Sequence, residues 1–259
     1  MTRLLREYRL GSTKDRLLAP FSKRYAGKLA LSRELRQMQA VMPFLLLSRD
    51  DRLAFVKNSK CGCTSIAQAF HFYDTGHFYK GNIHREGRHL RQGYSHWQEN
   101  WKSVEAERPF LFSFVRNPVS RLVSAYMDFV VLKRNPEAAQ HTETFAQRGL
   151  YQVDDKVDGL DRFLDLIADE FAVDPMLSDR HWRPQFLNLG GGLLDFQLIG
   201  KMERFTEDLR RLHVASGVSL ERFPVTIANR SGSEAIVATP EQRRKIRDLY
   251  EKDYEAYGY

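Results

Sequence analysis

The pattern of apolar and polar positions predicts short buried strands that alternate with amphipathic helices. Three segments are predicted as strands: Leu53–Val56, Phe110–Val115 and Asp195–Ile199. Apolar residues at helical spacing predict helices over Thr64–Phe72, Pro118–Leu132, Gly159–Phe171 and Glu203–Ser216. Strands that alternate with helices indicate an α/β fold. We therefore predict a single domain with a central parallel sheet flanked by helices.

Local signals refine this outline near the ends of the chain. Thr239, followed by Pro240 and then Gln242, is a capping pattern that predicts a helix start, and Gly217 predicts a helix end. Residues 74–102 show little periodicity and are predicted to be mostly loop. Residues 1–40 are rich in Arg, Lys and Leu, and we predict an N-terminal arm or helices there.

The chain's charge points to anionic partners without saying which ones. Its 259 residues, 42% hydrophobic and 28% charged, suffice for a full core, and the formal net charge is +7. A positive excess attracts anions over long range. Nucleic acid, a phosphorylated nucleotide and an acidic glycan all fit this charge.

The two cysteines and the apolar runs bear on the compartment. Cys61 and Cys63 are too close in sequence for good disulfide geometry and too few for a zinc site, so we predict small packing residues in a tight turn. No signal peptide is evident, and the longest apolar run, Val41–Leu47, contains Pro43 and is too short to cross a bilayer. A cytoplasmic location is expected. The basic region before residue 40 can touch an anionic membrane surface, although a solvated helix or flexible arm is the simpler interpretation.

The segment after the first predicted strand has the features of an anion cradle. Lys60, Cys61, Gly62, Cys63, Thr64 and Ser65 follow one another between strand and helix. Small residues let backbone N–H groups converge, the helix adds its positive end, and Lys60 adds a full charge. The common nucleotide loop is absent because the lysine precedes the glycine. A capped helix after a strand explains the segment equally well.

A second such turn follows the second predicted strand. Arg116 lies where that strand ends and a helix with Pro118 at its first position begins. Ligands of open α/β sheets gather at this edge, and a guanidinium there can clamp a phosphate. Ser124 lies further along the helix, and by spacing alone it is a surface or packing serine. Two such turns suggest a ligand with two phosphate-like groups.

Together the two turns resemble sulfotransferases that use 3′-phosphoadenosine 5′-phosphosulfate, most closely the carbohydrate branch. The second motif of that family, R-x-P-x-x-R-L-x-S-x-Y, is filled by Arg116, Pro118, Arg121, Leu122, Ser124 and Tyr126, while Lys60, Cys63 and Thr64 fit the first. His181–Gln185, Leu198–Glu203 and the C-terminal Tyr250–Tyr259 segment look like the same branch. The likeness spans residues 51–259 and leaves 1–50 uncovered. Members in the secretory pathway carry a membrane anchor and extra cysteines, which this chain lacks, so the resemblance implies a soluble, reduced relative.

The resemblance implies a fold like that of P-loop nucleotide-binding proteins and a set of site residues. Donor-binding residues would be Lys60, Gly62, Cys63, Thr64, Ser65, Arg116 and Ser124. Lys60 would also act in catalysis by offsetting charge on the leaving oxygen. No metal is implied, and the product would be adenosine 3′,5′-bisphosphate.

An acceptor hydroxyl needs a general base, and histidine suits that role near neutral pH. The candidates are His77, His84, His89, His96 and His181. The position of the base in related enzymes favours His89 and then His84, and Glu86 is an alternative. Lys80, Arg85, Arg88 and Arg91 are either a surface for an acidic glycan or a solvated face. His181, Trp182 and Arg183 form another patch suited to a sugar ring, or part of the core.

Two further functions compete with sulfuryl transfer. A kinase with an atypical phosphate loop would need ATP and magnesium, and no acidic metal ligand is evident. A non-catalytic binder of acidic glycans would tolerate the loss of Lys60. Nucleic-acid binding is disfavoured because no basic–aromatic ladder appears. The acceptor and the oligomeric state do not follow from the sequence.

Overall fold

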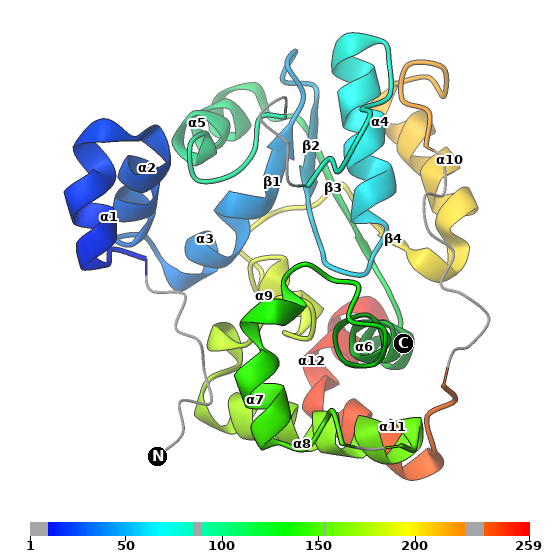
Figure 1. Ribbon diagram of the computed structural model, residues 1–259. Coiled ribbons are helices and arrows are strands. Elements are labelled where there is room, and N and C mark those ends of the chain that lie inside the picture. The colour runs from blue at the N-terminus through cyan, green and yellow to red at the C-terminus, as the bar shows by residue number, and fades with distance from the viewer. Residues whose placement is uncertain (1–9, 85–89, 153, 226–235) are drawn as a thin grey trace. The chain divides into compact units, whose positions relative to one another are not determined.

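The computed structural model describes residues 10–84, 90–152, 154–225 and 236–259 (Figure 1). These residues form two compact units. The first, here called the sheet unit, holds the described residues of 10–115 and 185–225. The second, here called the helical unit, holds the described residues of 116–184 and 236–259.

One four-stranded sheet organises the sheet unit, with strand order β1-β2-β3-β4. The strands are β1 (Leu45–Leu47), β2 (Leu53–Val56), β3 (Phe110–Val115) and β4 (Leu198–Lys201). β2, β3 and β4 run parallel, and β1 is an antiparallel edge strand beside β2. Because parallel strands end at the same edge of a sheet, the chain leaves β2, β3 and β4 on one side, where ligands of α/β proteins bind.

Aromatic side chains fill the core between this sheet and two helices. α4 (Cys63–Thr75) and α10 (Phe205–Ser216) lie on one side of the sheet, and α5 (Trp97–Glu107) lies on the other (Figure 1). The ring centroids of Phe55 and Phe112 are 5.2 Å apart, and those of Phe114 and Phe205 are 4.9 Å apart. The rings meet tilted, as aromatic pairs prefer. Phe70 of α4 joins this core, with its ring centroid 6.1 Å from that of Phe112, so α4 packs against the sheet.

The N-terminal part of the sheet unit is helical. It comprises α1 (Thr13–Leu18), α2 (Lys23–Leu31), α3 (Arg36–Val41) and the short 3-10 turns Ala19–Phe21 and Met42–Phe44. The indole of Trp97 donates a 2.9 Å hydrogen bond to the carbonyl of Gly27. A Cβ on Gly27 would lie 1.7 Å from the carbonyl oxygen of Tyr94, so only glycine permits this close approach.

The helical unit packs around a buried tryptophan. Its longer helices are α6 (Pro118–Tyr126), α7 (Thr142–Gln147), α8 (Lys156–Val173), α11 (Pro240–Leu249) and α12 (Glu251–Tyr257). A π-helical turn, Met127–Val131, extends α6. Trp182 is fully buried among Phe129, Phe145 and Phe163. The unit thus has a core of its own.

The predicted fold class is confirmed: the protein is mixed α/β, with a mostly parallel sheet flanked by helices. Two predicted strands have the observed bounds, while the third begins three residues later, at Leu198. The capping box at Thr239 and the left-handed end at Gly217 are also confirmed. None of the helices in the described ranges is both long and apolar enough to span a bilayer.

The prediction of loop over residues 74–102 was wrong from Trp97 onward, because α5 begins there. One of its inward positions is the polar residue Asn100. Its side-chain amide donates to the carbonyl of Arg91 at 2.8 Å and, at 3.4 Å, to that of Leu45. A buried polar residue on the inward face weakens the apolar period. The edge strand β1 was missed because it has only three residues and follows Pro43 closely.

Candidate anion-binding site

The turn between β2 and α4 is tightly curled. Lys60 and Gly62 both have left-handed backbone conformations, with φ of +67° and +73°. Glycine adopts this conformation freely, whereas a lysine there is strained by an amount on the order of 1–2 kcal/mol. Strain of this kind is often found at functional sites. The Lys60 backbone is therefore held in place by its surroundings.

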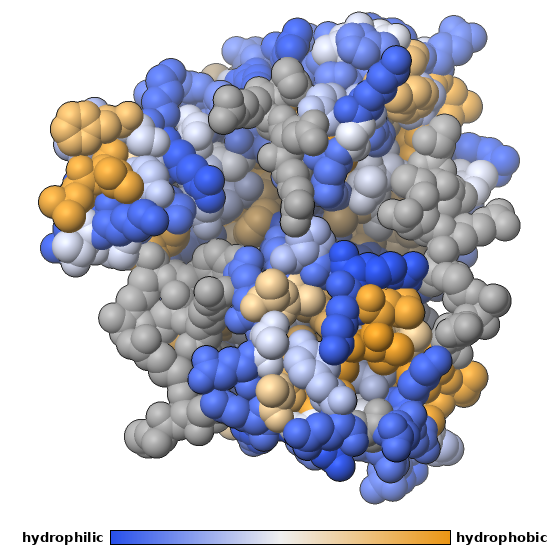
Figure 2. All heavy atoms as spheres, viewed as in Figure 1, coloured by the Kyte–Doolittle hydropathy of each residue, from blue (hydrophilic) through white to orange (hydrophobic). Residues whose placement is uncertain are grey.

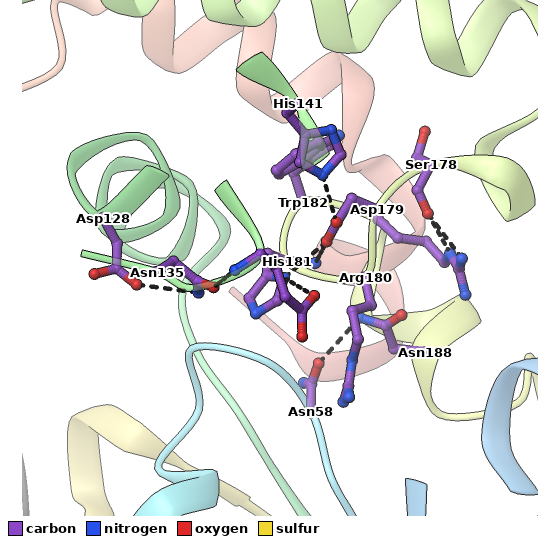
Figure 3. Close-up of polar contacts among 12 residues, drawn as sticks. Asn58, Asp128, Asn135, His141, Ser178, Asp179, Arg180, His181, Trp182 and Asn188 are labelled. Atoms are coloured by element: carbon purple, nitrogen blue, oxygen red, sulfur yellow. Dashed lines mark hydrogen bonds and ion pairs between the residues drawn. The ribbon is translucent and has the colours of Figure 1, made fainter. Parts of the chain in front are cut away.

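A buried polar network supplies that support. Asn58 is fully buried, and its amide donates to the carbonyl of Phe114 and to Gln185 Oε1, both at 3.1 Å. The amide of Asn188 donates to Asn58 Oδ1 at 3.3 Å (Figure 3). The thiol of Cys61 donates to Gln185 Oε1 at 3.3 Å. Gln185 and Asn188 thus attach the Lys60 turn to a distant segment of the sheet unit.

The start of α4 presents the donors of the turn. Cys63 is its first residue, followed by Thr64 and the buried Ser65, and Gly62 is the residue before it. Gly62, at the N-cap position, has no side chain with which to cap this helix start. Helix N-termini bind anions through backbone N–H groups and the helix dipole. Lys60 and the first turn of α4 therefore form a candidate anion site, as the sequence predicted for these residues.

Both cysteines are free thiols. Cys61 is buried and belongs to the polar network above, and Cys63 packs against the core of the sheet unit. The interpretation of both as packing residues in a tight turn therefore holds.

Polar contacts connect Lys57, which was not predicted as a site residue, to Thr64 through His84. Lys57, which is 8% exposed, places its Nζ 3.2 Å from Nδ1 of His84 and donates to Gln92 Oε1 at 3.2 Å. His84 Nε2 lies 2.9 Å from Thr64 Oγ1. An ammonium only donates, so Nδ1 accepts, and the neutral ring carries its proton on Nε2. Nε2 then donates to Thr64 Oγ1, which leaves the threonine proton to face an anion.

These contacts bear on the histidines predicted as general bases. The accepting nitrogen of His84 faces Lys57, which is the geometry of a residue that orients Thr64. The base role predicted for His84 stays a prediction. His89, Glu86, Arg85 and Arg88 lie outside the described residues. Arg91 pairs with Asp51 at 2.6 Å and donates to the carbonyl of Ser48 at 3.2 Å, which gives it a structural role.

A pair of His84 variants separates these two roles. His84→Gln keeps a carbonyl for Lys57 and an N–H group for Thr64 but cannot take a proton, whereas His84→Leu removes all three functions. We expect His84→Leu to raise the donor KM about tenfold, in line with one lost polar contact, and His84→Gln to stay near the wild-type protein. Steady-state kinetics with varied donor provides the measurement. An equal and large fall of kcat in both variants would instead support the base.

The second turn begins the helical unit at Arg116, which is partly exposed. Asn117 caps α6, because its side chain accepts from the N–H groups of Val119 at 3.0 Å and Ser120 at 3.3 Å. Ser124 is partly buried on α6. The local structure expected for this motif, a strand followed by Pro118 at a helix start, is therefore present.

The second arginine of this motif has a structural role. Arg121 is 1% exposed, and its guanidinium donates to the carbonyls of Arg183 at 3.0 Å and Arg180 at 2.8 Å. It thereby fixes the segment that carries His181 and Trp182. The hydroxyl of Tyr126, at the end of the motif, lies against Gly159, where a Cβ would be 2.1 Å away. Arg121 and Tyr126 of the motif thus serve packing.

The His181 segment forms a buried ionic cluster inside the helical unit (Figure 3). Asp179 contacts His141 Nε2 through one oxygen at 2.8 Å and His181 Nδ1 through the other at 2.7 Å. Burial opposes ionisation of Asp179, but the charge of His181 and hydrogen bonds from both histidines hold its pKa well below the usual range. Glu137 joins Asp179 and His181 in a group whose ligand atoms lie within 4.8 Å, although these hydrogen bonds already explain the cluster.

Trp182 belongs to the core and is not placed to stack on a sugar. Its indole donates to Glu170 Oε2 at 2.8 Å, and its carbonyl accepts from the hydroxyl of Tyr250. Burial raises the pKa of Glu170 to about 7, although the hydrogen bond from Trp182 works in the opposite direction. Of the alternatives open in the sequence, the structure favours a core role for this tryptophan.

The raised pKa of Glu170 makes stability depend on pH. The folded protein holds a proton that the unfolded chain releases above pH of about 4.5, so stability is highest below that pH and falls until about 7. The loss amounts to roughly 3 kcal/mol at 1.36 kcal/mol per unit. Glu170→Gln keeps an acceptor for Trp182 and should remove this fall. Urea unfolding between pH 4.5 and 8 measures it, and parallel curves for both proteins would contradict the assignment.

These features define a class before any comparison: an α/β protein with a candidate anion-binding strand–turn–helix at the end of β2 and an arginine directly after β3. The model of the sulfotransferase family matches residues 44–259, which is most of the chain. The protein therefore belongs to the sulfotransferase family, and membership makes it an enzyme of sulfuryl transfer. No solved structure matches the chain. The predicted division of the chain at residue 50 stays a prediction.

Proposed function

We propose that this enzyme moves a sulfuryl group from 3′-phosphoadenosine 5′-phosphosulfate to a hydroxyl of a carbohydrate acceptor. The observation that carries the proposal is the left-handed Lys60 directly before the start of α4, where Gly62 is the N-cap residue. The complete second motif from Arg116 to Tyr126 and membership of the sulfotransferase family support it. The donor has two phosphate groups, and the two turns offer one binding element for each.

Each predicted site residue has a role in this proposal. Thr64, Ser65 and the backbone N–H groups at the start of α4 bind the 5′-phosphate, and Gly62 and Cys63 let the backbone come close. Arg116 and Ser124 bind the 3′-phosphate. Lys60 binds the oxygen that bridges sulfur and phosphorus.

In the reaction, the acceptor oxygen attacks sulfur while the bond from sulfur to the bridging oxygen breaks. The acceptor proton passes to a general base, with His89 and His84 as the candidates. The products are a sulfate ester and adenosine 3′,5′-bisphosphate. Negative charge grows on the bridging oxygen as the bond breaks, and a fixed ammonium stabilises charge that develops in the transition state more than charge already present in the substrate. The proposal includes no metal.

The proposal also includes the class of the acceptor and the compartment in which the enzyme acts. A glycan or glycoconjugate hydroxyl is the acceptor class, nucleic acid is not a partner, and the cytoplasm is the expected compartment. The resemblance to the carbohydrate branch supports the acceptor class. A screen of sugars and cell extracts with labelled donor would name the acceptor.

Calorimetric titration of the full chain tests the donor. We expect adenosine 3′,5′-bisphosphate to bind without metal, because the proposed contacts are an arginine, a lysine and a helix start. The same titration with ATP, with and without magnesium, serves as the comparison. Tight binding of ATP that requires magnesium, with no response to the bisphosphate, would overturn the proposal in favour of a kinase.

A further inference from the structure

The N-terminal helical segment, residues 10–41, exposes apolar side chains outside the family match. Leu17 is 68% exposed and Phe21 86% exposed. Leu17 lies in the last turn of α1, and Phe21 ends the 3-10 turn Ala19–Phe21 that follows directly. Figure 2 shows apolar atoms gathered over this part of the molecule with hydrophilic atoms around them. A phenylalanine this exposed is unusual, and exposed apolar patches mark interaction sites.

The exposed charges of this segment are mostly positive. The exposed basic residues of the segment are Lys14, Arg16, Lys23, Arg24, Arg33 and Arg36. Glu34 is the one exposed acidic residue described in residues 10–41. The segment's other acid, Asp15, is buried and used internally, because it exchanges capping hydrogen bonds with Ser12. The outer face of the segment is thus apolar at its centre and basic around it.

The segment is anchored on its other side. Gly27 on α2 accepts the hydrogen bond from Trp97 on α5, and Lys28 lies over the ring of Tyr94 at 5.2 Å. The family match begins at residue 44, after this segment. Neither Leu17 nor Phe21 belongs to the proposed donor site. The transfer reaction therefore leaves this feature unexplained.

We propose that this segment binds the surface of an anionic lipid bilayer. Leu17 and Phe21 enter the boundary between headgroups and acyl chains, while the surrounding lysines and arginines contact lipid phosphates. An apolar tip within a basic face is typical of helices that lie in the membrane interface, and anionic lipids attract basic segments next to the surface. A nucleic acid would match the charge and leave the apolar tip unused. The inference goes beyond the proposed transfer reaction.

Co-sedimentation of the full chain with vesicles tests this inference. We expect binding to phosphatidylcholine vesicles that contain phosphatidylglycerol, weakened by salt, and little binding to phosphatidylcholine alone. The double variant Leu17→Ser/Phe21→Ser should bind about tenfold more weakly, because it removes the apolar contribution. Lys23→Glu/Arg24→Glu should weaken binding and reduce its salt dependence. Val214→Ser on α10 is the matched control, since Val214 is an apolar residue 85% exposed elsewhere in the sheet unit.

Two results would overturn the inference: equal binding to neutral and anionic vesicles, or unchanged binding by the Leu17→Ser/Phe21→Ser variant. Sedimentation velocity without lipid tests whether a second copy of the chain covers the patch instead. Self-association of the wild-type protein that the Leu17→Ser/Phe21→Ser variant abolishes would assign the patch to such a contact. Urea unfolding of each variant, compared with the wild-type protein, shows that the fold is intact. The lipid assay does not measure sulfuryl transfer. A negative result in it can therefore be told apart from a negative result for the proposed reaction.

Discussion

Replacing Lys60 with glycine should lower the rate of sulfuryl transfer about a hundred- to a thousandfold. Removing one preorganised group that stabilises charge in a transition state has an effect of this size. Glycine is the informative substitution because the backbone at Lys60 is left-handed, with φ of +67°. It relieves the strain of that conformation while it removes the ammonium. The stability of the variant should be equal or higher by about 1 kcal/mol, within the range for such sites.

The measurement is transfer of radiolabelled sulfate from the donor to an acceptor found by screening. Lys102→Ala is the matched control, because Lys102 is an exposed lysine on α5 away from the turn. A Lys60→Gly enzyme that turns over at the wild-type rate would refute the role of this ammonium. Absence of transfer by the wild-type protein itself to every acceptor screened would favour the alternative of a non-catalytic binder.

The two arginines of the second motif should give opposite results when each is changed to alanine. Arg116→Ala should weaken binding of adenosine 3′,5′-bisphosphate about a hundredfold, the expected effect of losing a bidentate charged contact. Its melting temperature should hardly change, because Arg116 is partly exposed. Arg121→Ala should instead lower the free energy of unfolding by roughly 3 kcal/mol, because the carbonyls of Arg180 and Arg183 lose their buried donor.

Calorimetry and urea unfolding of both variants provide the comparison. Arg134→Ala is the control, since Arg134 is exposed in the same unit. Unchanged bisphosphate binding by Arg116→Ala would remove the 3′-phosphate role. If Arg121→Ala were as stable as the wild-type protein and bound the bisphosphate more weakly, the roles assigned to the two arginines would be reversed.

Several elements of the fold followed from local patterns. β2 is a continuous apolar run, β3 is apolar except for Ser113, and the capping box at Thr239 is a contact within four residues. Such features depend on neighbouring side chains, so periodicity and capping rules find them. α5 was not predicted because a polar residue with distant partners lies on its inward face, and β1 was not predicted because it has only three residues. Asn100 on α5 contacts the carbonyl of Leu45, and β1 pairs with β2 across a turn.

The candidate site likewise contains residues that local patterns predicted and residues that they did not. Lys60, Thr64 and Arg116 were identified from residue types placed between a strand and a helix. Lys57 was not predicted as a site residue, although its position directly after a buried strand is a pattern that could have identified it. Its contacts with His84 and Gln92 span 27 and 35 residues. The buried position of Glu170 was not predicted, because the pattern of a helical segment does not show which carboxyl side chain packs beside an indole.

The sequence by itself determined where the strands β2 and β3 lie and to which family the chain is related, and it singled out two turns as candidate anion sites. These properties depend on the order of residue types over short stretches. Only the tertiary structure decided that Gln185 and Asn188 secure Asn58, that Arg121 serves packing, and that Leu17 and Phe21 face outward. Each depends on which residues, distant along the chain, become neighbours or stay exposed, and long-range packing sets that.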